Sequence, residues 1–291
     1  MKRVAFGIAA ALLGLGLPAC GDTAAQPAWA LGAGAETADE ANWRALDPAN
    51  LIVFETTKGR ILIEAYPDVA PKHYAQFKKI IQAGDLDGTT FHRVIDDFMA
   101  QGGDVSAKKG ADPGWPGIPG EFTFRRDVAK TPLDAVIGPE DTGKNGYLRG
   151  FPMLTQPSFF SEMSADGLVS TSIPHCRGVL STARTSDPNS GDTQFFLMRE
   201  HSPHLDKQYT AWGQVIAGQD VVKALKKGAP GSGTVDEPDL LTSAKMAADM
   251  PEASRPKAWV LRTDTEAFAA ELVTRGEVDV CDLPAIPALV K

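Results

Sequence analysis

Residues 91–104, FHRVIDDFMAQGGD, are the most informative stretch of the sequence. They combine one arginine, several apolar side chains and one amide side chain at close spacing. Arg93 carries a permanent charge, and Phe98, Met99 and Gln101 precede a glycine pair. Alternate residues of a β-strand share a face, so the side chains of Met99 and Gln101 should lie together. The stretch offers no evident nucleophile, which points away from covalent chemistry.

Two later stretches extend this pattern: STARTSDPNSGDTQFFLM from Ser181 and SPHLDKQYTAWGQV from Ser202. If residues 194–196 form a strand, Gln194 and Phe196 share one face and Phe195 lies on the other, in the core. Turned toward the first stretch, the shared face predicts an apolar floor with two amides and an arginine at its rim.

These three stretches resemble the cyclophilin family of peptidyl-prolyl cis–trans isomerases. FHRVIDDFMAQGGD is similar to the family's FHRxxxxFMxQGGD signature, and the later stretches resemble further family blocks in their bacterial form. The resemblance covers residues 50–122 and 175–250 and leaves out the rest of the chain. It implies a mainly β fold: a closed eight-stranded antiparallel β-barrel capped by two helices, here with a long insertion and a helical C-terminal extension.

The resemblance also implies roles for single residues. Arg93 matches the catalytic arginine, with Gln101 and Phe98 beside it. His204 stands where other members have a tryptophan that is associated with tight cyclosporin binding, so weak cyclosporin binding is expected. The residues matching the substrate-binding positions are Met99, Thr185, Ser186, Gln194, Phe196, His204, Leu205 and Tyr209.

The folded body is expected over residues 47–250. LIVFETTKGRILIEAY, from Leu51, predicts a β-hairpin around Lys58-Gly59. Helices are predicted from Pro71 to Gly84 and over QDVVKALKKG, which ends at Gly228. Many short strands with few helices favour an antiparallel barrel or sandwich, because parallel strands need long crossovers. The other short β-like runs are 91–95, 99–104, 178–183, 194–198 and 211–216.

Two segments fit this plan poorly. Residues 123–174 are rich in Pro, Gly, Asp and Ser and predict a long irregular insertion. Residues 251–291 form a C-terminal extension, in which TDTEAFAAELVTRG predicts a helix. Its expected capping box is Thr263 with Glu266, followed by a stop at Gly276.

The N-terminus has the pattern of an export signal. Residues 1–20 begin with MKR and continue with an apolar run that is too short for a comfortable membrane span. LPAC resembles a lipoprotein cleavage box and would place lipid on Cys20, whereas cleavage after Ala30 would release a soluble product. Residues 21–46 read as a flexible tether. The mature protein is expected in the periplasm or cell envelope, touching the membrane only through such a lipid.

The cysteines leave two readings open. Cys176 and Cys281 form an even pair once Cys20 is set aside, so they are either a disulfide or two separate thiols. His175 beside Cys176 does not indicate a cysteine hydrolase, because neighbouring strand residues point to opposite faces. No CxxC motif or Cys/His cluster is present, so neither a metal site nor another cofactor is expected.

Charge and chemistry narrow the function. The net charge of −8 argues against a nucleic-acid partner. A monomer is expected. The resemblance implies non-covalent cis–trans isomerisation of X–Pro bonds in exported polypeptides, with Arg93 stabilising the twisted amide. The alternative is a scaffold or holdase that binds proline-containing peptides with little catalysis.

Overall fold

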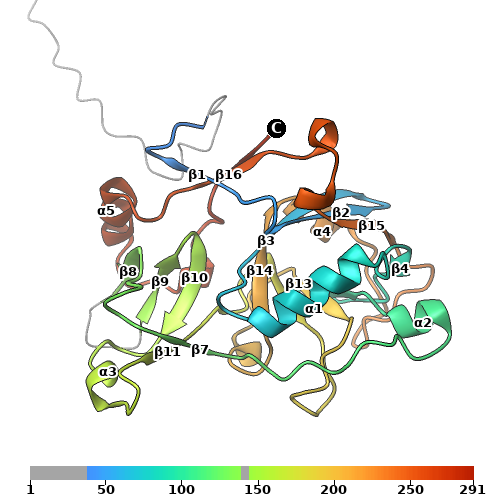
Figure 1. Ribbon diagram of the computed structural model, residues 1–291, viewed down its shortest axis with the longest axis horizontal. Helices are drawn as coiled ribbons and strands as arrows, with labels where there is room; N and C mark the ends of the chain where they lie inside the picture. Colours follow the sequence, from blue (N-terminus) through green and yellow to red (C-terminus); the bar gives the residue numbers. More distant parts are fainter. Residues whose placement is uncertain (1–37, 139–143) are drawn as a thin grey trace, which may run out of the picture.

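The computed structural model describes residues 38–138 and 144–291. In that part the chain is mainly β, with three antiparallel sheets and five α-helices (Figure 1). The expected signal peptide, Cys20 and residues 21–37 of the expected tether lie outside the described residues. Within them, no helix has both the length and the apolar character needed to cross a membrane.

The largest sheet has nine strands in the order β4-β15-β2-β3-β14-β12-β13-β6-β5. It curls, and its first and last strands, β4 (Thr89–Thr90) and β5 (Arg93–Val94), are separated in the chain only by residues 91–92. The expected closed barrel of eight strands is not confirmed, because there are nine strands and the described residues show no pairing of β4 with β5. The remaining strands are β2 (Leu51–Thr56), β3 (Gly59–Ala65), β6 (Met99–Gly102), β12 (Val179–Thr182), β13 (Phe195–Met198), β14 (Ala211–Ala217) and β15 (Leu240–Met246).

The hairpin expected near Lys58-Gly59 is confirmed as β2 and β3. Its register runs from Leu51↔Glu64 to Thr56↔Gly59. Gly59 has a φ of +133°, which an L side chain rarely adopts, and Thr56 Oγ1 donates to its carbonyl at 2.7 Å. The turn therefore depends on this glycine.

Both expected barrel helices are present. α1 (Pro71–Gln82) buries Phe77, Ile80 and Ile81 and packs on β15. α4 (Gln219–Ala224) ends before the expected stop at Gly228, because Leu225 turns to a ψ of 136°. The backbone N–H of Gly228 donates instead to the carbonyl of Val94 in β5. A short helix, α2 (Val105–Lys109), and a 3-10 turn, η2 (Pro203–Leu205), complete this part.

The insertion is a folded sheet and not an irregular loop. Its five strands lie in the order β7-β11-β10-β9-β8 and occupy one side of the molecule in Figure 1. The sequence hid them, because each strand has three to five residues and apolar residues are sparse. The elements are β7 (Phe124–Arg126), β8 (Ala135–Ile137), β9 (Lys144–Leu148), β10 (Phe151–Thr155), α3 (Phe160–Met163) and β11 (Val169–Ser172).

The two ends of the described chain meet in the third sheet. β16 (Ala258–Leu261) pairs with β17 (Ala288–Val290) and with β1 (Trp43–Ala45), so the last residues of the expected tether are folded. Figure 1 shows this sheet above the insertion. Two 3-10 turns, η3 (Ala247–Asp249) and η4 (Glu252–Ser254), precede it.

The expected C-terminal helix is confirmed as α5 (Glu266–Arg275), which packs beside β8 (Figure 1). The expected capping box was wrong. Thr265 is the N-cap, and its hydroxyl accepts from the N–H of Phe268. Thr263 is 2% exposed and donates to Asp134 in the insertion, so a tertiary contact takes the hydroxyl that the motif assigned to the helix.

A disulfide joins the extension to the body. Cys281, in η5 (Val280–Asp282), is bonded to Cys176, 105 residues away in the sequence. This settles the alternative that the sequence left open. Because the sulfur of Cys176 is in this bond, it is not a nucleophile, in line with the argument against a hydrolase.

The buried side chains form two clusters on opposite faces of the main sheet. One holds Phe195 with Phe54 and Trp212, and α1 packs against it. The other holds Phe196 and also includes side chains of the insertion and the extension. Adjacent residues of β13 thus face different cores, as strand alternation requires.

Candidate active site

The arginine, one of the two expected amides and the apolar floor come together around one hollow of about 360 Å³, here called the Arg93 hollow. Eight of the residues singled out in the sequence line it: Arg93, Phe98, Met99, Gln101, Phe196, His204, Leu205 and Tyr209. The others are Ala183, Arg184 and Gln208. No carboxylate lines the hollow, so its two guanidiniums set the sign of its electrostatic potential.

Strand register brings Arg93 and Gln101 together. They are directly paired across β5 and β6, and Arg93 Nη1 lies 3.3 Å from Gln101 Oε1 and 3.9 Å from Met99 Sδ. Gln101 Nε2 donates in turn to Gln194 Oε1 at 2.9 Å. The amide of Gln101 therefore orients the guanidinium from one side and is itself held from the other.

A glycine turn fixes the base of the arginine side chain. Arg93 Nε donates to the carbonyl of Ser232 at 3.0 Å. The turn passes so close that a Cβ on Gly233, whose φ is +74°, would lie 2.4 Å from Ile95 Cγ1. Any larger residue at Gly233 would push the turn, and with it the Arg93 side chain, out of place.

Aromatic contacts build the apolar wall. Phe196 is 4% exposed, and its ring meets that of Tyr209 edge-on at 5.7 Å. Phe98 is stacked on His204, with ring centroids 5.5 Å apart. Leu205 is 6% exposed and is held in the turn η2. The hollow thus has a fixed apolar floor, which removes water from whatever enters it.

His175 supports this wall from beneath, a role that sequence reasoning missed. Its fully buried ring is stacked on Phe196 at a centroid distance of 6.0 Å. Its Nδ1 lies 3.0 Å from Asp206 Oδ1 and its Nε2 lies 2.8 Å from Ser181 Oγ. Burial lowers the pKa of His175 although the Asp206 carboxylate opposes that shift, so the ring is neutral near pH 7.

Arg184 is a second cation at the rim. Its guanidinium lies 4.4 Å from the centroid of the Tyr209 ring and 5.5 Å from that of Phe122. It also donates to the carbonyl of Gln208 through Nε and Nη2. The sequence signal was weak, because a lone arginine in a polar loop is usually a solvated surface residue.

A neighbouring hollow of about 260 Å³, the Thr185 hollow, shares Gln101, Ala183 and Arg184 with the first. Thr185 and Gln194 line it, as expected for residues beside the main site, together with Ala183, Ser190 and Asp192. Ser186 is exposed and lines neither hollow. The hydroxyl of Thr185 is engaged with Ser190 Oγ at 2.8 Å.

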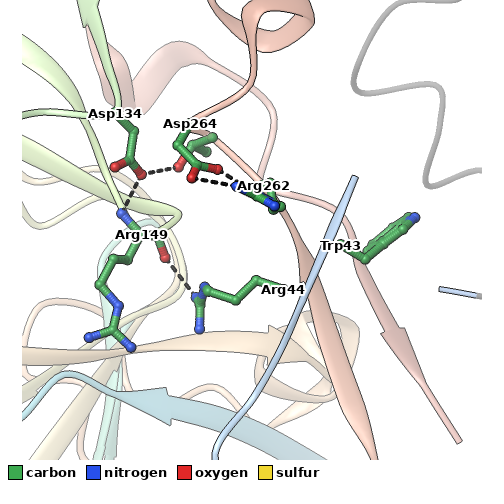
Figure 2. A pocket seen from close by; sticks show the side chains of 7 residues that line it. Trp43, Arg44, Asp134, Arg149, Arg262 and Asp264 are labelled. Carbon is green, nitrogen blue, oxygen red and sulfur yellow. Dashed lines mark hydrogen bonds and ion pairs between the residues drawn. The ribbon is translucent and has the colours of Figure 1, made fainter. Parts of the chain in front are cut away.

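A further hollow of about 210 Å³ lies where β1, the insertion and the extension meet (Figure 2). Its charged groups are largely paired: Arg262 with Asp264, and Arg44 with Glu64 and the carbonyl of Arg149. The carboxylate of Asp134 accepts from Thr263 and from a backbone N–H, and burial raises its pKa. We interpret this region as a joint between the three segments.

Among the described residues, one trio of potential metal ligands lies where the extension meets the body. Side-chain atoms of His201, Asp279 and Cys281 lie within 4.8 Å of one another. The sulfur of Cys281 is bonded to Cys176, which leaves one imidazole and one carboxylate. Two ligands are fewer than structural or catalytic zinc sites use.

Comparisons with known proteins agree with the motifs. The family model for "Cyclophilin type peptidyl-prolyl cis-trans isomerase/CLD" matches residues 51–246. A "Probable peptidyl-prolyl cis-trans isomerase" of Brucella abortus is 35% identical over 206 residues, which make up 70% of this chain and 86% of that protein. A "Peptidyl-prolyl cis-trans isomerase-like 1" of Rhizopus delemar is 30% identical over 175 residues, 60% of this chain and 78% of that protein.

A solved structure extends the likeness beyond the region that the family model covers. The crystal structure of cyclophilin AquaCyp293 from Hirschia baltica has a TM-score of 0.80 and 46% identity. It covers 86% of this chain and 93% of its own, a larger share than residues 51–246 make up. The chain therefore belongs to the cyclophilin-type peptidyl-prolyl cis–trans isomerases and is an enzyme that interconverts the isomers of X–Pro peptide bonds.

Proposed function

We propose that the Arg93 hollow binds the proline of a polypeptide exported from the cytoplasm and that Arg93 stabilises the twisted amide during rotation. The observation that carries this proposal is the position of the Arg93 guanidinium. It lies at the rim of a buried apolar floor and is held by Gln101 and by the carbonyl of Ser232.

Amide resonance explains why a fixed cation is useful here. Rotation breaks C–N resonance, at a cost of roughly 18–20 kcal/mol. In the twisted state the proline nitrogen regains a localised lone pair and accepts a hydrogen bond better than in either planar state. A donor aimed at that nitrogen therefore binds the transition state more strongly than the substrate or the product, which is the condition for catalysis.

The magnitudes require more than one contribution. A ten-thousandfold acceleration needs roughly 5 kcal/mol. One charge-assisted hydrogen bond contributes about 1.5–3 kcal/mol. The remainder is assigned to exclusion of water by the Phe196 wall and to twisting of the bound peptide. Arginine suits this role, because it stays charged and has no proton to surrender at working pH.

Substitution of Arg93 tests the role. Arg93→Ala should lower kcat/KM for a proline tetrapeptide by roughly 10- to 150-fold, the loss of one charged hydrogen bond, with a thermal midpoint within a few degrees. Arg60→Ala, which removes an exposed arginine paired with Glu55, is the control and should leave turnover unchanged. An Arg93→Ala enzyme of normal stability and undiminished turnover would exclude the assignment.

The alternative of a scaffold or holdase predicts negligible turnover for the full-length chain. Deleting residues 123–174 is a poor discriminator, because the insertion shares a buried cluster with Phe196 and its removal would expose that cluster. Turnover of the intact protein, measured beside its ability to keep an unfolded client soluble, separates the two functions.

Work outside the cytoplasm is part of the proposal. The export-type N-terminus supports it, and so does the Cys176–Cys281 disulfide, since disulfides persist in oxidising compartments. Slow X–Pro isomerisation can limit folding there, which gives an exported isomerase a task. Mass spectrometry of the mature protein tests this, because a diacylated Cys20 and a free Leu31 give N-termini of different mass.

A further inference from the structure

The insertion contains a buried cation with only neutral partners. Arg126, in β7, is 4% exposed. Its guanidinium donates to Thr171 Oγ1 at 3.2 Å, to the carbonyl of Thr131 at 2.6 Å and to Thr155 Oγ1 at 3.2 Å. Over residues 38–138 and 144–291, no carboxylate forms an ion pair with it.

Other arginines of the chain show how unusual this is. Arg199 is also buried, but its Nη2 lies 2.6 Å from a carboxylate oxygen of Asp96. Arg125, next to Arg126 in β7, is exposed and paired with Asp166. A buried charge without a counterion is costly, and an arginine cannot escape the cost by losing its proton. Burial lowers the pKa of Arg126, but the group stays charged at working pH.

The guanidinium also has donors to spare. Arginine carries five N–H groups, and the three bonds from Arg126 leave one N–H on each terminal nitrogen. Two parallel N–H groups are what a carboxylate accepts in a bidentate pair. Arg126 therefore offers one carboxylate a positive charge and an unbonded N–H on each terminal nitrogen.

Arg126 lines a hollow of about 260 Å³, here called the Arg126 hollow. Beside Arg126 lie Thr155 and Gln156, which make one part of the hollow polar. The rest is largely apolar, and Val136 is 37% exposed there. The full lining is Arg126, Val128, Pro132, Leu133, Val136, Thr155, Gln156 and Ser158.

We propose that the Arg126 hollow is a second binding site, separate from the isomerase site, that takes a small apolar monocarboxylate. The carboxylate pairs with the Arg126 fork, and its apolar group lies against Leu133 and Val136. The volume suits one apolar residue or a short acyl chain, since it is somewhat smaller than the usual site for a drug-sized molecule. Two kinds of molecule supply such a monocarboxylate: a peptide through its free C-terminus, and a short fatty acid.

Calorimetric titration of the full-length protein with three proline-free probes tests the proposal. N-acetyl-Ala-Leu as the free acid represents a peptide end, its amide is the neutral match, and hexanoate represents the acyl source. At least one acid should bind, and the amide should bind at least about tenfold more weakly than its acid, the effect of one charge-assisted contact. Binding of one acid alone identifies the source.

Neighbouring arginines give a matched pair of variants. Arg126→Met keeps the length of the side chain and should weaken acid binding at least about tenfold, whereas Arg125→Met should leave it unchanged. X–Pro turnover takes place at the Arg93 hollow, on the nine-stranded sheet, so it reports whether each variant is folded. If Arg126→Met does not fold, Ser158→Asp at the exposed rim replaces it and should weaken acid binding by repulsion.

Two outcomes would overturn the proposal. The first is that neither acid binds the wild-type protein. The second is that the acids bind but the Arg126→Met and Arg125→Met proteins bind them equally well. If Ser158→Asp is used instead of Arg126→Met, the corresponding outcome is that the Ser158→Asp protein and the wild type bind them equally well. Neither result would touch the isomerase assignment, because no probe contains proline.

Discussion

Three arginines show that the surroundings of a side chain decide what it does. Arg199 is buried against Asp96 and backbone carbonyls, so its charge is neutralised within the fold. Arg93 is held by neutral acceptors at the rim of an open hollow, so its charge remains available to a bound peptide. Arg126 is buried with neutral partners, so within the described residues no carboxylate balances its charge.

The identity of residue 204 should control drug sensitivity. His204 lies on Phe98 at the mouth of the Arg93 hollow, where a tryptophan would offer cyclosporin a larger apolar surface. His204→Trp should therefore tighten inhibition by roughly tenfold, about 1.4 kcal/mol. Inhibition constants of cyclosporin for the wild-type and variant enzymes check this.

The matched control is His201→Trp, a substitution outside the hollow. It should leave cyclosporin inhibition as weak as in the wild type. Tight inhibition of the unaltered enzyme would contradict the expectation drawn from His204.

Strand periodicity predicted which side chains share a face, but not what supports them. Alternation placed Phe195 and Phe196 on opposite faces and Met99 with Gln101, and the structure agrees. His175 was missed, because its partners are 6 and 31 residues away and no short-range spacing reveals them.

At the scale of elements, turn and helix motifs predicted the structure correctly where interactions between residues close in the sequence stabilise it. The β2–β3 hairpin and α1 have strong turn and helix signals, and both were predicted. The strands of the insertion were missed, because packing on the Phe196 cluster, and not their own composition, stabilises them. Thr263 is a second example of a tertiary interaction that a local motif does not reveal, since its hydroxyl donates to Asp134 and does not cap the helix.

The disulfide should be the main stabiliser of the extension. It closes a loop of 105 residues. In the chain-entropy account, a loop of about 100 residues contributes up to about 5 kcal/mol by restricting the unfolded chain. The double variant Cys176→Ser, Cys281→Ser should therefore lose several kcal/mol of unfolding free energy, measured by guanidinium denaturation.

Reductant supplies the control for this measurement. It should destabilise the wild-type protein and leave the double-serine variant unaffected. If the two proteins unfold at the same denaturant concentration under oxidising conditions, the bond does not carry the stability assigned to it.

For the whole molecule, two buried histidines set a pH dependence. Burial lowers the pKa of both His73 and His175, against the opposing influence of Glu121 and Asp206. The unfolded chain, with a histidine pKa of about 6.5, then binds more protons than the folded one below that pH. The stability contribution is therefore present above about pH 6.5 and is lost as the pH falls toward the folded-state values.

Urea denaturation between pH 7.5 and 5.5 measures this loss. His73→Asn and His175→Asn should each flatten the slope of unfolding free energy against pH. If neither histidine substitution changes the dependence of unfolding free energy on pH, the two histidines are not its source.

The margins of the three sheets have a consequence for a catalyst that handles extended chains. Each sheet finishes in strands of only two or three residues: β4 and β5, β7 and β8, β1 and β17. Longer margins would present rows of unpaired N–H and C=O groups on which a foreign polypeptide could assemble. Within the described residues the enzyme exposes little such template, so an extended chain has few places to add to it as a further strand.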